Sequence, residues 1–187
     1  MLFNDKTPII AIATAPGRGG IGVIRLSFEA DLADPILAAL FPQRSIEPRR
    51  VQLLPFLDEN NALLDHAVVL YFSAPASYTG ESVLEIQAHG GTLVMEKILN
   101  LLLAGGARLA EAGEYSKRAF LNGKMDLAQA EAVMQIISAQ GREAMKAAQA
   151  GHDGALSRRI EKLRSDLTDI GAHLAAWADY PDDDIPQ

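Results

Sequence analysis

The stretch 17–27, GRGGIGVIRLS, decides the fold class of this chain. Its first six residues match the G-x-G-x-x-G pattern of dinucleotide-binding folds, in which a helix must follow at once so that its N-terminus can hold a pyrophosphate. The residues that do follow, 23–27, are instead typical of a β-strand, because β-branched and apolar side chains dominate them. The sequence therefore predicts a glycine-rich turn between two strands, with Arg18 at its tip.

The residues on both sides of this stretch alternate strand and helix patterns. Apolar runs rich in β-branched residues predict strands over 8–14, 22–27, 51–57, 64–72 and 83–88. The polar residues 58–61, DENN, indicate a hairpin loop between the third and fourth of these strands. This order predicts an α+β fold with a mixed, mainly antiparallel sheet and packed helices.

Two helices are expected within this sheet-forming half. The first begins at Asp34 and Pro35 and runs through Phe41, with Asp34 as N-cap and Pro35 in the first helical position. The residues 90–92, GGT, lead into the second, which ends near the glycines at 105 and 106. Its expected buried face consists of Leu93, Ile98, Leu101 and Leu102.

Strand patterns stop at about residue 114, and the remainder is predicted to be helical. Asp126 with Gln129 three positions later forms a capping box, which predicts a helix start. The expected buried stripe of that helix is Leu127, Ala130, Val133, Met134 and Ile137. Further on, apolar residues spaced alternately four and three apart form a heptad seam, which must be covered by other helices or by a dimer partner. They are Leu156, Ile160, Leu163, Leu167, Ile170, Leu174 and Trp177.

The composition excludes several kinds of chemistry. The 187 residues contain no cysteine, which excludes disulfides, thiolate catalysis and Cys-ligated metals. The 17 Lys and Arg against 24 Asp and Glu give a net charge of −7, unlike a free-standing nucleic-acid binder. No apolar run reaches the roughly 18 residues needed to cross a membrane. With no signal-peptide pattern either, we expect a cytoplasmic chain without a membrane contact.

Several polar residues are candidates for a functional site. Arg25 lies in the middle of a predicted strand, where a guanidinium suits recognition of an anion or a carboxylate. The loop 75–81, PASYTGE, connects two strands. Because loops lie at the surface, packing does not dictate which side chains this loop carries. Lys117, Arg118 and Lys124 form a local basic patch on an acidic chain.

Four groups of residues, in chain order, resemble the MnmE (TrmE) family of tRNA-modification GTPases. They are APGRGGIGVIRLS at 15–27, SYTGE and EIQAHGG within 77–91, AGEYSKRAFLNGKMDLAQAEA at 112–132, and ADYPDDD at 178–184. The resemblance implies an N-terminal folate-binding and dimerisation domain over 1–118, similar to the folate-binding domains of one-carbon enzymes. It implies the beginning of a helical domain over 119–187, with the family's GTPase domain expected beyond.

The resemblance also implies a ligand and three contacts for it. The ligand is a tetrahydrofolate that carries a one-carbon unit, as the 5-formyl or methylene derivative. The family's folate contacts fall on Arg25, Glu81 and Lys124, with Arg18 as a weaker fourth candidate. A carboxylate suits the N–H donors of the pterin edge, and cations suit the glutamate carboxylates of folate.

The resemblance implies partners for the parent protein. It forms a homodimer and works with the flavoprotein MnmG to place an aminomethyl-type group on the wobble uridine of tRNA. The resemblance further implies that the parent protein hydrolyses GTP with magnesium and potassium. The pair Gly123-Lys124 is followed by Met125 and is not part of a P-loop, so residues 1–187 are not expected to hydrolyse GTP. We also expect no catalytic and no metal-binding residues among them.

Three alternatives remain open from the residues themselves. The chain could be a dimerisation scaffold without functional folate binding. It could bind a nucleotide through 17–22, which requires a helix after Gly22. It could bind tRNA directly through Lys117, Arg118 and Lys124, which predicts a steep dependence on salt.

Overall fold

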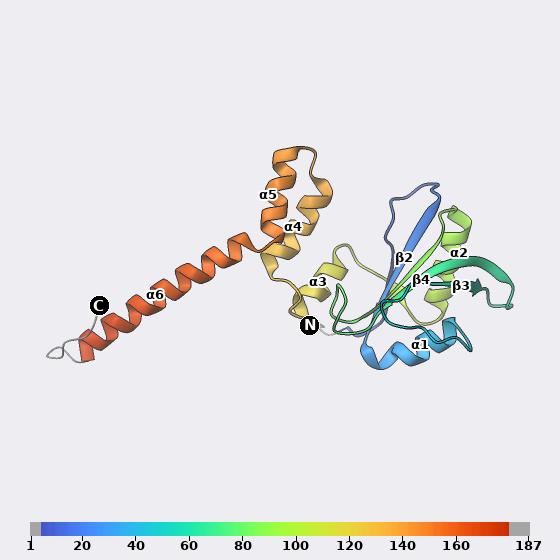
Figure 1. Ribbon diagram of the computed structural model, residues 1–187, viewed down its shortest axis with the longest axis horizontal. Helices are drawn as coiled ribbons and strands as arrows, with labels where there is room; N and C mark the ends of the chain where they lie inside the picture. The colour runs from blue at the N-terminus through green and yellow to red at the C-terminus, as the bar shows by residue number, and fades with distance from the viewer. Residues whose placement is uncertain (1–4, 180–187) are drawn as a thin grey trace. The chain divides into compact units, whose positions relative to one another are not determined.

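A computed structural model describes residues 5–179 of the chain (Figure 1). The chain divides into two compact units, Met1–Lys124 and Met125–Gln187. The division expected from the sequence between residues 118 and 119 falls inside a helix of the first unit, Glu114–Leu121. The acidic residues Asp182–Asp184 of the last motif lie outside the described residues.

The first unit alternates strands and helices in the expected order. Its elements are β1 (Ile9–Ile12), β2 (Ile21–Phe28), the 3-10 helix η1 (Ala30–Leu32), α1 (Ala33–Leu40), β3 (Gln52–Leu57), β4 (Leu63–Phe72), β5 (Ser82–His89), α2 (Thr92–Ala104), β6 (Arg108–Leu109) and α3 (Glu114–Leu121). The five strands predicted from apolar runs are confirmed. The sixth, β6, is too short to show a pattern in the sequence.

The strands form one six-stranded sheet in the order β3-β4-β5-β2-β1-β6. The pairing of β1 with β6 is parallel, and the pairings between the other neighbours are antiparallel. The hairpin between β3 and β4 closes where Asp58 N donates to Ala62 O. The predicted α+β class with a mixed, mainly antiparallel sheet is therefore confirmed.

Alternation along β2 gives the sheet two different faces. Ile24 and Leu26 are buried in the apolar core, which also contains Met95 and Ile98 of α2. Arg25 points to the opposite face, where the hydroxyl of Tyr115 in α3 donates to the Arg25 carbonyl. One face is thus an apolar core and the other carries polar groups.

Two details of the predicted helices are wrong. Helix α1 begins at Ala33, directly after η1, so Asp34 lies within its first turn and is not its N-cap. The 3-10 helix runs directly into α1, so the N-cap position falls on Leu32, which has no capping side chain. In α2, Leu93 is exposed and Met95 is buried in its place, because the Met95 side chain packs against Gly22 of β2.

The glycine-rich turn before β2 packs directly against the residues that precede α2. Gly19 N donates to Gly90 O, and Gly90 N donates to Gly20 O. A Cβ at Gly90 would lie 2.6 Å from Gly19 O and 2.9 Å from Ile21 O. Because a strand and not a helix follows the turn, the dinucleotide-binding alternative is excluded.

The second unit is helical, with α4 (Leu127–Ser138), α5 (Arg142–His152) and α6 (Ala155–Asp179). The predicted capping box is confirmed, since Asp126 accepts from Gln129 N and Gln129 accepts from Asp126 N. The expected buried stripe of α4 is wrong. Leu127, Met134 and Ile137 are exposed, because α4 meets α5 through the small residue Ala132, which lies against Gly151.

The heptad seam lies along one continuous helix, as its spacing predicts. Its seven apolar side chains, from Leu156 to Trp177, are between 53% and 67% exposed on α6. No helix among residues 5–179 is long and apolar enough to cross a membrane.

Replacing Gly90 with alanine should destabilise the first unit. The added methyl meets backbone atoms of 19–21 that cannot rotate away, so we expect the free energy of unfolding to fall by about 1–3 kcal/mol. Gly91→Ala is the matched control, because a Cβ there meets nothing within 4 Å. Urea unfolding of the 187-residue chain measures both, and equal stabilities would contradict the packing described.

Candidate binding site

A hollow of about 470 Å³ lies on the polar face of the sheet. Three strands (β2, β4 and β5), the segment before β3, the loop before β5 and one residue that follows α3 contribute to it. Its lining consists of Arg25, Arg49, Phe72, Ala76, Ser77, Tyr78, Val83, Glu85 and Lys124. The hollow therefore combines three cationic side chains, one carboxylate and two aromatic rings.

An ion pair between neighbouring strands lies at the centre of this lining. Arg25 of β2 and Glu85 of β5 are directly opposite in the sheet register. The Nε and Nη2 atoms of Arg25 donate to Oε1 of Glu85 at 2.9 and 2.7 Å. Among residues 5–179, no donor to Oε2 of Glu85 is found, so this oxygen remains for a donor from a ligand.

Two tyrosines hold the guanidinium of Arg25 from the sides. Its Cζ lies 5.9 Å from the ring centroids of both Tyr78 and Tyr115. Tyr78 also shares a hydrogen bond of 2.8 Å with Ser116 of α3. Burial raises the pKa of Tyr115, so its hydroxyl stays protonated as a donor to the backbone of β2. Arg25 is thereby fixed in position before any ligand binds.

The end of α3 and the loop before β5 are connected by short contacts. Lys124 Nζ donates to Pro75 O at 3.1 Å, and Asn122 Nδ2 donates to Thr79 O at 2.8 Å. Gly80 has a φ of 80°, and a Cβ there would lie 2.9 Å from Asn122 Cβ. Only glycine suits this approach, so the loop residues and Lys124 are held together as one wall of the hollow.

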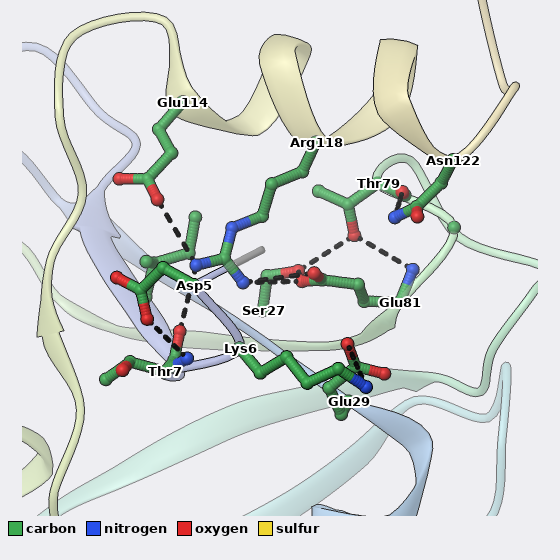
Figure 2. A network of polar contacts seen from close by, with 12 residues as sticks. Asp5, Lys6, Thr7, Ser27, Glu29, Thr79, Glu81, Glu114, Arg118 and Asn122 are labelled. Atoms are coloured by element: carbon green, nitrogen blue, oxygen red, sulfur yellow. Dashed lines mark hydrogen bonds and ion pairs between the residues drawn. The ribbon is translucent and has the colours of Figure 1, made fainter. Parts of the chain in front are cut away.

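Glu81 lies outside the lining of the hollow, in a buried polar network (Figure 2). Its two carboxylate oxygens each accept from Nη1 of Arg118 at 3.0 Å, and Oε2 also accepts from Ser27 Oγ at 2.7 Å. The side chains of Arg118 and Glu81 are only 7% and 10% exposed. Thr79, fully buried, shares a further hydrogen bond with Ser27.

The network continues from Arg118 toward the start of the chain. Arg118 Nη2 donates to Thr7 O at 2.9 Å and to Glu114 at 3.2 Å. Arg108 donates to both oxygens of Glu114 and also to Asp5. Hydrogen bonds from Arg108 are the main reason that the pKa of Glu114 is lowered from 4.5 to about 2. No buried side-chain N or O among the described residues lacks a partner.

The structure brings together two of the three residues expected to bind a ligand. Arg25 and Lys124 line the same hollow, whereas Glu81 does not. Sequence reasoning missed Glu85 and Arg49. The alternation along 83–88 could have indicated Glu85, because it places this residue on the polar face of the sheet, opposite the core residues Leu84 and Ile86.

The remaining candidates lie elsewhere. Arg18 lines a second hollow of about 380 Å³ between the glycine-rich turn and the start of α2. Arg118 is buried in its ion pairs, so the basic patch proposed for direct tRNA binding loses its central member. Lys117 is exposed and does not line the hollow.

Taken together, these features define an α+β domain with a polar hollow on one face of its sheet, followed by a helical domain. Sequence comparison agrees with this division. Residues 8–124 match the family described as GTP-binding protein TrmE N-terminus, and residues 127–187 match the MnmE helical domain. The chain belongs to the MnmE (TrmE) family of tRNA-modification GTPases.

Curated relatives extend the same assignment. The tRNA modification GTPase MnmE of Burkholderia lata is 50% identical over 99% of this chain and 41% of its own length. The proteins of the same name from Paraburkholderia xenovorans and Akkermansia muciniphila are each 48% identical, over 99% and 98% of this chain. The chain thus spans 41% of the length of these relatives.

Removing the guanidinium of Arg118 should strongly destabilise the first unit. Arg118→Met leaves Glu81 and Glu114 buried without their shared partner, so we expect a loss of about 3–5 kcal/mol in the free energy of unfolding. The neighbouring Lys117→Met, on an exposed side chain, is the control and should change stability by less than about 0.5 kcal/mol. Urea unfolding measures both, and a small loss in Arg118→Met would refute the network's role.

The lowered pKa of Glu114 predicts a particular pH dependence. A carboxyl whose pKa is lower in the folded than in the unfolded state stabilises the protein at pH values above its unfolded-state pKa. This stabilisation disappears as the pH falls through its folded-state pKa. The change from 4.5 to about 2 corresponds to about 3 kcal/mol. Glu114→Gln should therefore be less stable at pH 7 and lose less stability between pH 5 and 2. The measurement is denaturant unfolding at several pH values, and the same loss of stability between pH 5 and 2 as in the unmodified chain would contradict this. Glu143→Gln, on an exposed side chain, serves as the control.

Proposed function

We propose that the first unit binds a reduced folate with a one-carbon group, as 5-formyl- or methylene-tetrahydrofolate, in the hollow on the polar face of the sheet. The observation that carries this proposal is the meeting of Arg25, Glu85 and Lys124 in one lining. Family membership supports it, because the resemblance from which the ligand was expected covers the same residues.

The chemistry of the lining suits the head of a folate. The amino-pyrimidinone edge of a pterin presents neighbouring N–H donors, which a carboxylate oxygen can accept. Glu85 has Oε2 available for this, while Oε1 holds Arg25. Tyr78 and Phe72 offer flat apolar surface to the ring system. We therefore assign the direct carboxylate contact to Glu85.

Glu81, the carboxylate expected from the resemblance, acts in this proposal through the loop that it anchors. Its pair with Arg118 fixes the end of the loop that carries Ser77 and Tyr78 into the hollow. Its own backbone carbonyl also accepts a hydrogen bond from Ser77 Oγ. A change at Glu81 should therefore lower stability and affinity together.

The wider role of the chain follows from its family. We propose that it forms a cytoplasmic homodimer and works with MnmG on the wobble uridine of tRNA. Binding and hydrolysis of GTP, with magnesium and potassium, belong in this proposal to the longer protein, since the chain spans 41% of its relatives. A dimerisation scaffold without folate binding is the competing function.

Titration calorimetry of the dimeric chain with 5-formyl-tetrahydrofolate tests the proposal. Glu85→Gln should weaken binding by at least tenfold, about 1.4 kcal/mol, with a smaller loss of thermal stability than Glu81→Gln. Glu81→Gln should lower both the affinity and the melting temperature, because it breaks a buried ion pair.

The matched control is Glu96→Gln, an exposed carboxylate beside the second hollow, which should bind folate unchanged. A dimer that binds no folate would support the scaffold instead. Unchanged affinity in Glu85→Gln would refute the assignment of the direct contact.

A further inference from the structure

The rim of the hollow carries two cations, Arg49 and Lys124, that pair with no carboxylate within residues 5–179. Arg49 and Lys124 both line it, and neither forms an ion pair with any residue that the structure describes. They donate instead to successive carbonyls of the same loop, Lys124 to Pro75 O and Arg49 to Ala76 O. Both residues are exposed, in contrast to the partly buried Arg25 and Glu85. The lining is therefore charge-neutral inside and positive at its mouth.

Arg49 is held in an uncommon conformation at this mouth. Its φ is 62°, in the left-handed region that side chains other than glycine, asparagine and aspartate seldom adopt. Its backbone N donates to Tyr71 O at 2.7 Å, and Nη2 donates to Ala76 O at 2.7 Å. Its Cζ lies 6.0 Å from the ring centroid of Phe72, inside the lining. The guanidinium is thus fixed beside the hollow and needs little ordering when a ligand arrives.

The hydrogen bond to Ala76 O uses one N–H of Nη2 at the edge of the guanidinium and leaves the other N–H donors for a ligand. Arginine has five N–H donors in a planar fork, and Ala76 O takes one of them. The remaining donors can bind a carboxylate, the anion that this planar geometry matches best. Lys124 adds a point charge on the neighbouring loop carbonyl.

We propose that Arg49, together with Lys124, binds the glutamate carboxylates of the folate tail and so fixes the ligand's direction. This inference rests on the proposed folate function. The neutral, donor-rich pterin lies at Arg25 and Glu85, where a cation and a carboxylate already balance. The anionic tail lies at the positive mouth, where Arg49 and Lys124 form no ion pair with the carboxylates that the structure describes. Arg49 is then a specificity residue for the charged end of the ligand.

The test compares two ligands that differ only in the tail. These are 5-formyl-tetrahydrofolate and the primary amide of 5-formyl-tetrahydropteroic acid, which lacks the glutamate and carries no carboxylate. In calorimetry on the whole chain, Arg49→Gln should weaken the first by about tenfold and the second by less than twofold. Arg50→Gln is the matched control, because Arg50 is the next residue, is exposed, pairs with Glu47 and does not line the hollow. It should bind both ligands as the unmodified chain does.

Each other outcome overturns a different statement. If the unmodified chain binds neither ligand, the proposed function fails and this inference with it. If it binds folate and Arg49→Gln binds equally well, the role of Arg49 is refuted while the folate site stands. If Arg49→Gln weakens both ligands equally, with its melting temperature unchanged, Arg49 supports the loop and does not contact the tail.

Discussion

The buried ion pair between Arg118 and Glu81 is the interaction on which the polar side of the first unit depends. A guanidinium and a carboxylate that are both nearly inaccessible to water must satisfy each other, since the cost of burying either alone is several kcal/mol. Arg118 belongs to α3, Glu81 ends the loop before β5, and Ser27 adds β2 to the same cluster. Three segments far apart in sequence are thereby joined on one face of the sheet.

This junction explains why a hollow exists there at all. The opposite face is filled by apolar side chains of α1 and α2, as alternation along β2 requires. On the polar face α3 contacts the sheet through Tyr115 and Arg118 near one end, and it holds the loop that carries Tyr78. The space between that loop, Lys124 and the strands stays open. A rigid sheet therefore supplies Arg25 and Glu85, and the anchored loop supplies the wall.

The sequence predicts features that depend on neighbouring residues and misses those that depend on distant ones. The strands and the capping box of Asp126 and Gln129 follow from local patterns, and both are confirmed. The pairing of Arg25 with Glu85 depends on the register between β2 and β5, which no local pattern contains, so Glu85 was missed. Glu81 was expected from the family resemblance, and its direct contact with a ligand stays a prediction. Arg49 was missed because its left-handed backbone is imposed by its contacts with β4 and the loop.

We propose that folate occupies the hollow beside Arg25 and Glu85. Amide and methyl NMR of the labelled chain during titration with 5-formyl-tetrahydrofolate tests this most directly, because the two hollows involve different residues. Binding in this hollow should give the largest shift changes at 76–78 and Val83. Changes confined to 17–22 and Thr92, around the second hollow, would contradict it.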